Sequence, residues 1–141
     1  METKQTKIGF KFVDRVCDRL LSWTVPKHFR IEYKENEWVK PSDGSPLFLF
    51  DSEEDARQHS VLSKLYRCLY VPYHRQDFDM IPNAYSAMYA DKKVLDTFWK
   101  DPSFRDKSLN LGHVIKGTVF ASEVKLLELL PTPEYDNFRK P

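Results

Sequence analysis

Glycine is scarce in this sequence of 141 residues, which contains four. Gly9, Gly44, Gly112 and Gly117 do not form a closely spaced cluster. The loops that hold phosphates in Walker-type and dinucleotide-binding proteins need such a cluster, because their backbone must approach the phosphate groups. The sequence therefore excludes nucleotide chemistry by those two routes.

Cysteine is also rare, and the two thiols are Cys17 and Cys68. Neither belongs to a Cys-x-x-Cys pair, and no His/Cys cluster has zinc-finger spacing. Two such thiols in a chain of this size are typical of a reduced, intracellular protein. No run approaches the roughly 20 apolar residues of a membrane span, and the polar N-terminus leads into no signal peptide. We expect a soluble, cytoplasmic protein with no membrane partner.

An excess of either charge is missing as well: 22 Lys and Arg stand against 21 Asp and Glu, a net charge of +1. Proteins that bind double-stranded DNA or membrane surfaces normally show a basic excess, so neither partner is expected. Aromatic residues are abundant, at 14% of the chain. They must lie in the core or on a recognition surface.

The apolar pattern predicts an α+β fold, with a mainly antiparallel sheet of about five or six strands and two short helices. Ile8, Phe10 and Phe12 alternate with Gly9 and Lys11, as in a half-buried strand. The other expected strands are Phe29–Tyr33, a central strand Leu47–Phe50 buried on both faces, Lys64–Val71, Gly117–Ala121 and Glu123–Leu130.

Cap residues predict the helices. Asp51 or Ser52 caps a short helix that ends near Ser60, and Asp91 caps a second helix that runs through Trp99. Two segments are ambiguous. Val16–Trp23 presents a short helical face, and Glu123–Leu130 is consistent with a helix capped by Ser122, although its alternation favours a strand.

The chain is expected to form one domain over residues 1–130, followed by a flexible, proline-containing tail over residues 131–141. Within the domain, residues 74–113 show little regular pattern apart from the helix after Asp91. We call this segment the excursion. Long irregular connections are uncommon unless they are functional or disordered, and the aromatic content of the excursion argues against disorder.

Arginine and aromatic side chains are the candidate ligand contacts. Arginine binds phosphate or carboxylate groups bidentately, and aromatic rings stack on bases. Together they are able to build a nucleotide-like pocket without a catalytic group. The alternative is that the aromatic residues form a satellite core beneath the excursion and that the arginines are solvated. The candidates are Arg57, Arg67, Arg75, Phe78, Tyr85, Tyr89 and Trp99.

A metal site and a catalytic nucleophile are weaker possibilities. His74, Asp77 and Asp79 offer imidazole and carboxylate ligands, but no second cluster completes a coordination shell, so solvated loop charges are the favoured interpretation. Both cysteines are assigned to structural roles. We expect neither a cofactor nor a metal, and no catalytic residue is assigned from the pattern alone.

One resemblance is to small phage and bacterial α+β proteins. It covers about half of the chain. Its segments are structural and are not ones that recognise a ligand, so it assigns no binding residue. Some phage proteins of this size, the Thoeris anti-defence sponges, sequester signalling nucleotides of the cyclic ADP-ribose kind, and the chain resembles them. The shared segments are Glu37–Trp38, Pro46–Phe50, Asp55–Arg57, Tyr66–Cys68, Gly117–Val119 and Glu123–Glu128.

A second resemblance is to ADP-ribosyltransferase-like folds. There a strand similar to Leu47–Phe50 leads into a helix similar to Ser52–Ser60 and then a strand similar to Leu65–Val71. This resemblance implies an enzyme that uses NAD, with Glu123 as the catalytic glutamate; the other residues of that motif set are missing from the chain.

These observations favour a non-catalytic binding module for a small nucleotide-like ligand or a protein partner. The alternatives are the NAD-using enzyme and a structural subunit of a homo-oligomer, in which exposed aromatic residues form the interface.

Overall fold

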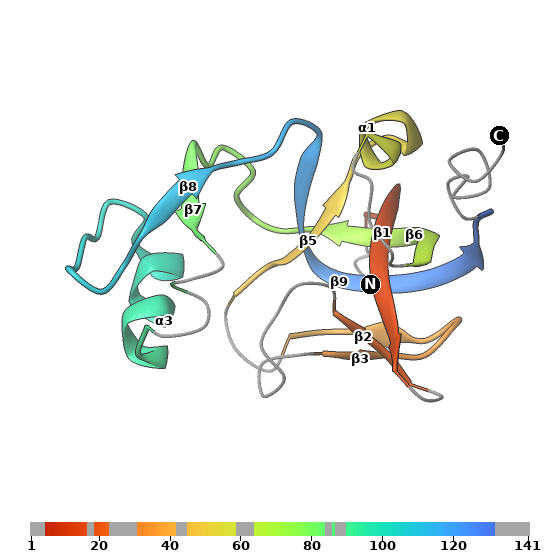
Figure 1. Ribbon diagram of the computed structural model, residues 1–141, viewed down its shortest axis with the longest axis horizontal. Coiled ribbons are helices and arrows are strands. Elements are labelled where there is room, and N and C mark those ends of the chain that lie inside the picture. Colours follow the sequence, from red (N-terminus) through yellow and green to blue (C-terminus); the bar gives the residue numbers. More distant parts are fainter. Residues whose placement is uncertain are drawn as a thin grey trace, which may run out of the picture.

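The computed structural model describes residues 5–16, 19–22, 31–41, 45–58, 64–83, 86 and 90–131 (Figure 1). Antiparallel strands are the commonest regular structure among these residues, in agreement with the expected α+β class. The helices are α1 (Glu53–Arg57) and α3 (Lys92–Lys100). The strands are β1 (Lys7–Val16), β2 (Arg19–Ser22), β3 (Glu32–Tyr33), β4 (Trp38–Val39), β5 (Leu47–Phe50), β6 (Lys64–Pro72), β7 (Met80–Pro82), β8 (Leu111–His113) and β9 (Thr118–Leu129).

Four strands close into a small barrel. β1 pairs with β5 and β6, and β9 pairs with the same two strands, so that the ladder returns to its start. β2 and β3 extend this sheet from β1, and β4 pairs with β9, so that the sheet contains seven of the strands in the described part of the chain. Register shifts at Arg67/Cys68 and Val71/Pro72 interrupt the β6–β9 ladder. Such bulges bend and twist a strand, which assists closure.

The barrel interior is apolar. Gly9 allows β1 to pass close to the interior side chains, because a Cβ atom at this position would lie 2.5 Å from Leu49 Cδ1 and 3.0 Å from the Tyr70 ring. Burying this cluster supplies the main stabilisation of the barrel, at roughly 25 cal/mol per Å² of apolar surface. The buried members are Val13, Tyr33, Leu47, Leu49, Tyr66, Cys68, Tyr70, Ala121, Val124 and Leu126.

Helix α1 covers part of the outer face of the barrel. The Ser52 hydroxyl accepts a hydrogen bond from the Asp55 backbone N–H at 3.1 Å, as expected for an N-cap, and this starts the helix. Ala56 is fully buried. It packs with Phe12, Phe50, Leu65 and Leu130, which form a second apolar cluster.

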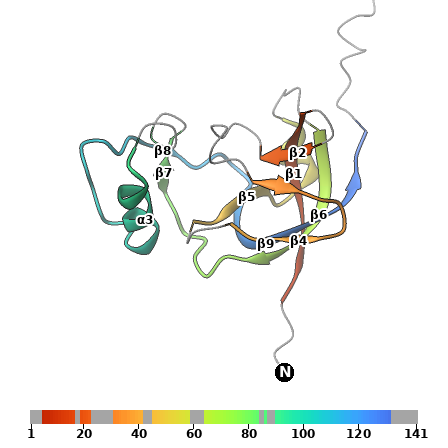
Figure 2. The ribbon, with the colours of Figure 1, turned by 90° about the horizontal axis from the view of Figure 1, so that it is seen from below.

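The excursion forms a separate layer beside one end of the barrel, with α3 and the β7–β8 pair packed together (Figures 1 and 2). Its anchor to β9 is Gln76. The Gln76 side chain donates from Nε2 to the Phe120 carbonyl at 2.6 Å and accepts from the Phe120 N–H at 2.9 Å. The Tyr73 N–H donates to the same carbonyl at 2.9 Å. One amide side chain thus continues the hydrogen bonding of the sheet into the excursion.

The structure confirms several expected elements and corrects others. The strands at Leu47–Phe50 and Lys64–Val71, the Ser52 cap and the helix after Asp91 are confirmed. Of the strand expected at Phe29–Tyr33, β3 covers the last two residues, and residues 29–30 lie outside the described part.

Three expectations are wrong. The helical interpretation of Val16–Trp23 fails because Arg19–Ser22 pairs with β1 as a strand. The two strands expected after Gly117 are one strand, β9, which also rules out the helical alternative there. The strand count of five or six is too low, because short strands such as β4 and β7 were missed.

Two burial expectations also need correction. β1 is covered on both faces rather than half-buried, with Val13 in the barrel interior and Phe12 beneath α1. In β5, by contrast, the Phe48 side chain is 38% exposed, so this strand is not buried throughout. Residues 59–60 and 132–141 lie outside the described part, as do the end of the first expected helix and most of the expected tail.

Candidate ligand-binding site

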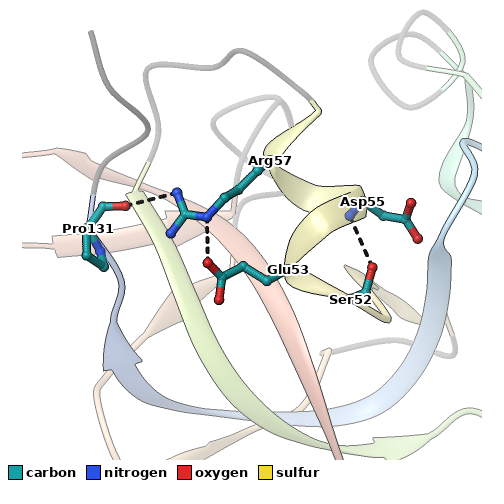
Figure 3. A network of polar contacts seen from close by, with 5 residues as sticks. All are labelled: Ser52, Glu53, Asp55, Arg57 and Pro131. Carbon is teal, nitrogen blue, oxygen red and sulfur yellow. Dashed lines mark hydrogen bonds and ion pairs between the residues drawn. The ribbon is translucent and has the colours of Figure 1, made fainter. Parts of the chain in front are cut away.

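Arg57 is held at the far end of β9 from the excursion. Its Nε donates to Glu53 Oε2 at 2.6 Å, one helical turn earlier, and its Nη1 donates to the Pro131 carbonyl at 3.2 Å (Figure 3). These contacts fasten α1 to the chain just after β9. Because a carboxylate already neutralises the guanidinium, we assign Arg57 the structural role of fastening α1 and not the role of a ligand contact.

Arg67 is also paired, on the outside of the barrel. It lies between Tyr66 and Cys68, whose side chains belong to the interior cluster, so it points outward. Its Nη2 donates to Glu128 Oε2 at 3.0 Å, directly across the β6–β9 ladder. An exposed cross-strand pair of this kind contributes about 0.2–1 kcal/mol. Arg57 and Arg67 therefore lie near the C-terminal end of β9, separated from the excursion.

Arg75 differs from the other two arginines. Its Nε donates to Asp77 Oδ1 at 2.9 Å, and its guanidinium carbon lies 5.3 Å from the centre of the Phe78 ring. Among the residues that the structure describes, neither terminal nitrogen of Arg75 has a hydrogen-bond partner. The Arg75 side chain is 41% exposed. These two nitrogens are the pair that binds a phosphate or carboxylate in the bidentate geometry.

The ring beneath Arg75 belongs to a cluster of four aromatic side chains, Phe48, Phe78, Trp99 and Phe120, which we call the aromatic junction. Phe78 lies 5.4 Å from Trp99 and 4.7 Å from Phe120, measured between ring centroids. Phe48 contacts the same two rings, at 5.9 Å from Trp99 and 5.4 Å from Phe120. The junction thus joins barrel strands β5 and β9 to the excursion.

Exposure differs sharply within the aromatic junction. Phe78 and Trp99 are 7% and 8% exposed, and Phe120 is 1% exposed. Phe78 and Trp99 pack with Phe98 and Leu109 in a satellite core of the excursion, the alternative that the sequence left open. Phe48, at 38% exposed, is the ring of the junction that offers a face to a ligand. It was not among the residues selected from the sequence.

Among the other candidates in the excursion, those that the structure describes form no metal site. Tyr85 and Tyr89 lie outside the described residues. The His74 ring packs on the Tyr73 ring, with centroids 4.2 Å apart, while Asp77 pairs with Arg75. Within the described ranges, no group of three or more metal-ligating side chains is close enough to hold a metal ion. His74, Asp77 and Asp79 therefore do not come together as a metal centre.

Glu123, the catalytic residue of the alternative reading, lies on β9 and is 6% exposed. Lys40 Nζ lies 3.8 Å from Glu123 Oε1. A carboxylate acting on NAD must face the cofactor, whereas this carboxylate is covered and compensated by a lysine. The surroundings of Glu123 are those of a structural residue and not those of a catalytic one.

A buried lysine was not recognised in the sequence. Lys11 is 7% exposed, and its Nζ donates to the Phe48 carbonyl at 2.6 Å. The amine also lies 5.4 Å from the centre of the Tyr33 ring. Burial lowers the pKa of Lys11 to about 8, against a smaller opposing effect of Cys68. Lys11 shares its face of β1 with Gly9 and Val13, whereas the apolar pattern points to the opposite face, with Phe10 and Phe12, as the buried one.

Comparisons of the chain with protein-family models, curated proteins and solved structures gave no significant match. The candidate site is therefore argued from its own geometry. Within the described part of the chain, none of the helices has the length and apolar character needed to cross a membrane.

Proposed function

We propose that the protein is a non-catalytic binding module for a small, nucleotide-like ligand and that the aromatic junction is its binding site. One observation carries the proposal. The Arg75 guanidinium, with both terminal nitrogens unpartnered among the described residues, lies on Phe78, and Phe78 shares its ring contacts with the exposed Phe48. A cation and an exposed ring on one rigid aromatic cluster suit a ligand that combines a phosphate with a base.

The ligand's base stacks on Phe48, and its phosphate pairs with the terminal nitrogens of Arg75. Stacking of a base on an aromatic side chain contributes about 1–3 kcal/mol. Hydrogen bonds to a charged group contribute about 1.5–3 kcal/mol. Trp99 and Phe120 support the Phe48 ring from beneath, which reduces the entropy lost when the ligand binds.

Asp77 is the carboxylate that already contacts Arg75, so its strength as a competitor of the phosphate has to be compared with the phosphate contact. Its side chain is 80% exposed and contacts Arg75 through Nε, on a different edge of the guanidinium from the terminal nitrogens. An exposed ion pair of this kind is worth about 0.2–1 kcal/mol, less than a bidentate phosphate contact. The ligand therefore gains the terminal nitrogens without first breaking a strong internal pair.

Isothermal titration calorimetry with ADP and with ADP-ribose tests the proposal. Phe48→Ala and Arg75→Ala each weaken binding about tenfold or more, from the lost stacking and the lost phosphate contact. Arg67→Ala is the matched control, because it removes an exposed, paired arginine far from the junction. Its affinity equals that of the wild type.

Equal losses for Arg67→Ala and Arg75→Ala would contradict the site. Absence of binding by the wild type would overturn the nucleotide-like ligand. In that case the exposed Phe48 would point to a protein interface, which native mass spectrometry of the same sample detects as a retained partner or a stable homo-oligomer.

A further inference from the structure

The barrel has a weak seam between β1 and β5. These two strands share a single ladder pair, Phe10 with Phe50. On its other edge β1 pairs with β6 from Lys7 to Val13. From Val13 onward the edge of β1 that faces β5 pairs with β2 instead. Closure at this seam therefore depends on contacts other than the backbone ladder.

Lys11 provides such a contact. It follows Phe10 directly along β1, and its Nζ reaches across to the carbonyl of Phe48, two residues before Phe50 in β5. The 2.6 Å hydrogen bond thus lies where the ladder has ended. The ring of Tyr33 lies 5.4 Å from the amine. A long side chain thus adds a hydrogen bond between β1 and β5 beyond their single ladder pair.

We propose that Lys11 is a positioning residue for the ligand site, because its amine closes the β1–β5 seam and fixes the backbone of Phe48, whose ring the ligand stacks on. This inference rests on the proposed function. The same residue supplies the carbonyl to Lys11 and the exposed ring to the aromatic junction. Phe48 stays paired with Phe120 in the β5–β9 ladder, so a loosened seam shifts this pair, and with it the Phe48 ring, relative to Trp99.

Protonation of Lys11 adjusts this contact. Charge-assisted hydrogen bonds are about twice as strong as neutral ones, and burial brings the pKa of Lys11 to about 8. Two neighbouring groups, Cys68 and Tyr70, are shifted in the opposite direction. Burial raises the pKa of Cys68 on β6 to about 12, and burial also raises the pKa of Tyr70. The Tyr66 hydroxyl donates to Glu35 at 2.8 Å.

The affinity for ADP at pH 7.5 and pH 9.5 tests the inference. The wild type binds about fivefold more weakly at pH 9.5, as the bond from Lys11 loses its charge. Lys11→Met binds weakly at both values, whereas Lys11→Arg, which stays charged, binds equally well at both. Lys125→Met is the control, because Lys125 lies over Trp38 elsewhere on the barrel. It keeps the pH dependence of the wild type.

A readout without ligand separates this inference from the proposed function. Trp99 contacts Phe48, so its fluorescence reports the position of that ring in the free protein. Emission from Trp99, measured in a background with the other two tryptophans replaced by Phe, changes near pH 8 and loses this change in Lys11→Met.

Binding by the wild type with no difference in Lys11→Met overturns the positioning role alone. No binding, together with the fluorescence change, overturns the ligand but retains the seam contact. An unchanged emission overturns the seam contact.

Discussion

The pH dependence of stability follows directly from the burial of Lys11. The pKa of this lysine falls from 10.5 to about 8 in the folded protein. Between these values the unfolded chain binds more protons than the folded chain, so the free energy of unfolding rises with pH. The full shift corresponds to about 3 kcal/mol. From pH 7.5 to pH 9, the wild type gains about 1 kcal/mol of this amount.

Two neighbours define the useful pH range. The pKa of Cys68 is raised from 9.0 to about 12 by burial, which makes the folded chain bind more protons above pH 9. Burial also raises the pKa of Tyr70 above its ordinary value of 10.0. Both groups lower stability as pH rises further. In the unfolded chain Cys68 is half-deprotonated at pH 9, which offsets about 0.4 kcal/mol of the gain. The comparison with Lys11→Met therefore isolates the Lys11 effect.

Urea unfolding at pH 7.5 and pH 9 measures the effect. Lys11→Met has no group to titrate at this position, so its free energy of unfolding lacks the gain of about 1 kcal/mol seen in the wild type. Lys125→Met, which removes a lysine outside the barrel interior, retains the gain. An equal increase in the wild type and in Lys11→Met would refute the argument that burial of Lys11 makes stability depend on pH.

Two further predictions concern how the excursion and β9 are held. Gln76→Ala removes both hydrogen bonds to the β9 backbone and lowers the free energy of unfolding by about 1–3 kcal/mol. Amide hydrogen exchange in this variant rises more in the excursion than in the barrel. A loss of stability as small as that of Gln58→Ala, at an exposed glutamine, would argue against the anchor. Gly117→Ala places a side chain at φ 85° and a Cβ 2.7 Å from Asp55 Cβ, which costs about 1–2 kcal/mol. Thermal unfolding compares it with Gly112→Ala, where the nearest atom is 3.6 Å away, and equal melting temperatures for the two variants would disprove the strain.

Part of the candidate site was accessible from the sequence. Arg75, Phe78 and Trp99 were selected because guanidinium and aromatic groups recognise nucleotides. Their density in a long irregular segment supported that selection. Phe48 and Lys11 were missed. Phe48 stands in a run of four apolar residues, which gives no sign that one of them is exposed, and Lys11 was placed on the polar side of a half-buried strand.

Several local elements follow from the sequence alone. Ser52 and Asp91 cap their helices because their side chains bond to backbone N–H groups two or three residues later. Alternation of apolar and polar residues predicts β6 and the second half of β9 as strands. Caps and alternation each depend on residues close together in the chain, so a short stretch of sequence is enough to show them.

Which faces are covered and which charges are paired depends on contacts between distant parts of the chain. Alternation in β1 separates two sets of side chains but cannot tell that α1 covers one set and the barrel encloses the other. Likewise, Arg67 and Glu128 are 61 residues apart in sequence, and their pairing depends on the β6–β9 register. Closure of the barrel brings distant segments together, and no local pattern encodes those contacts.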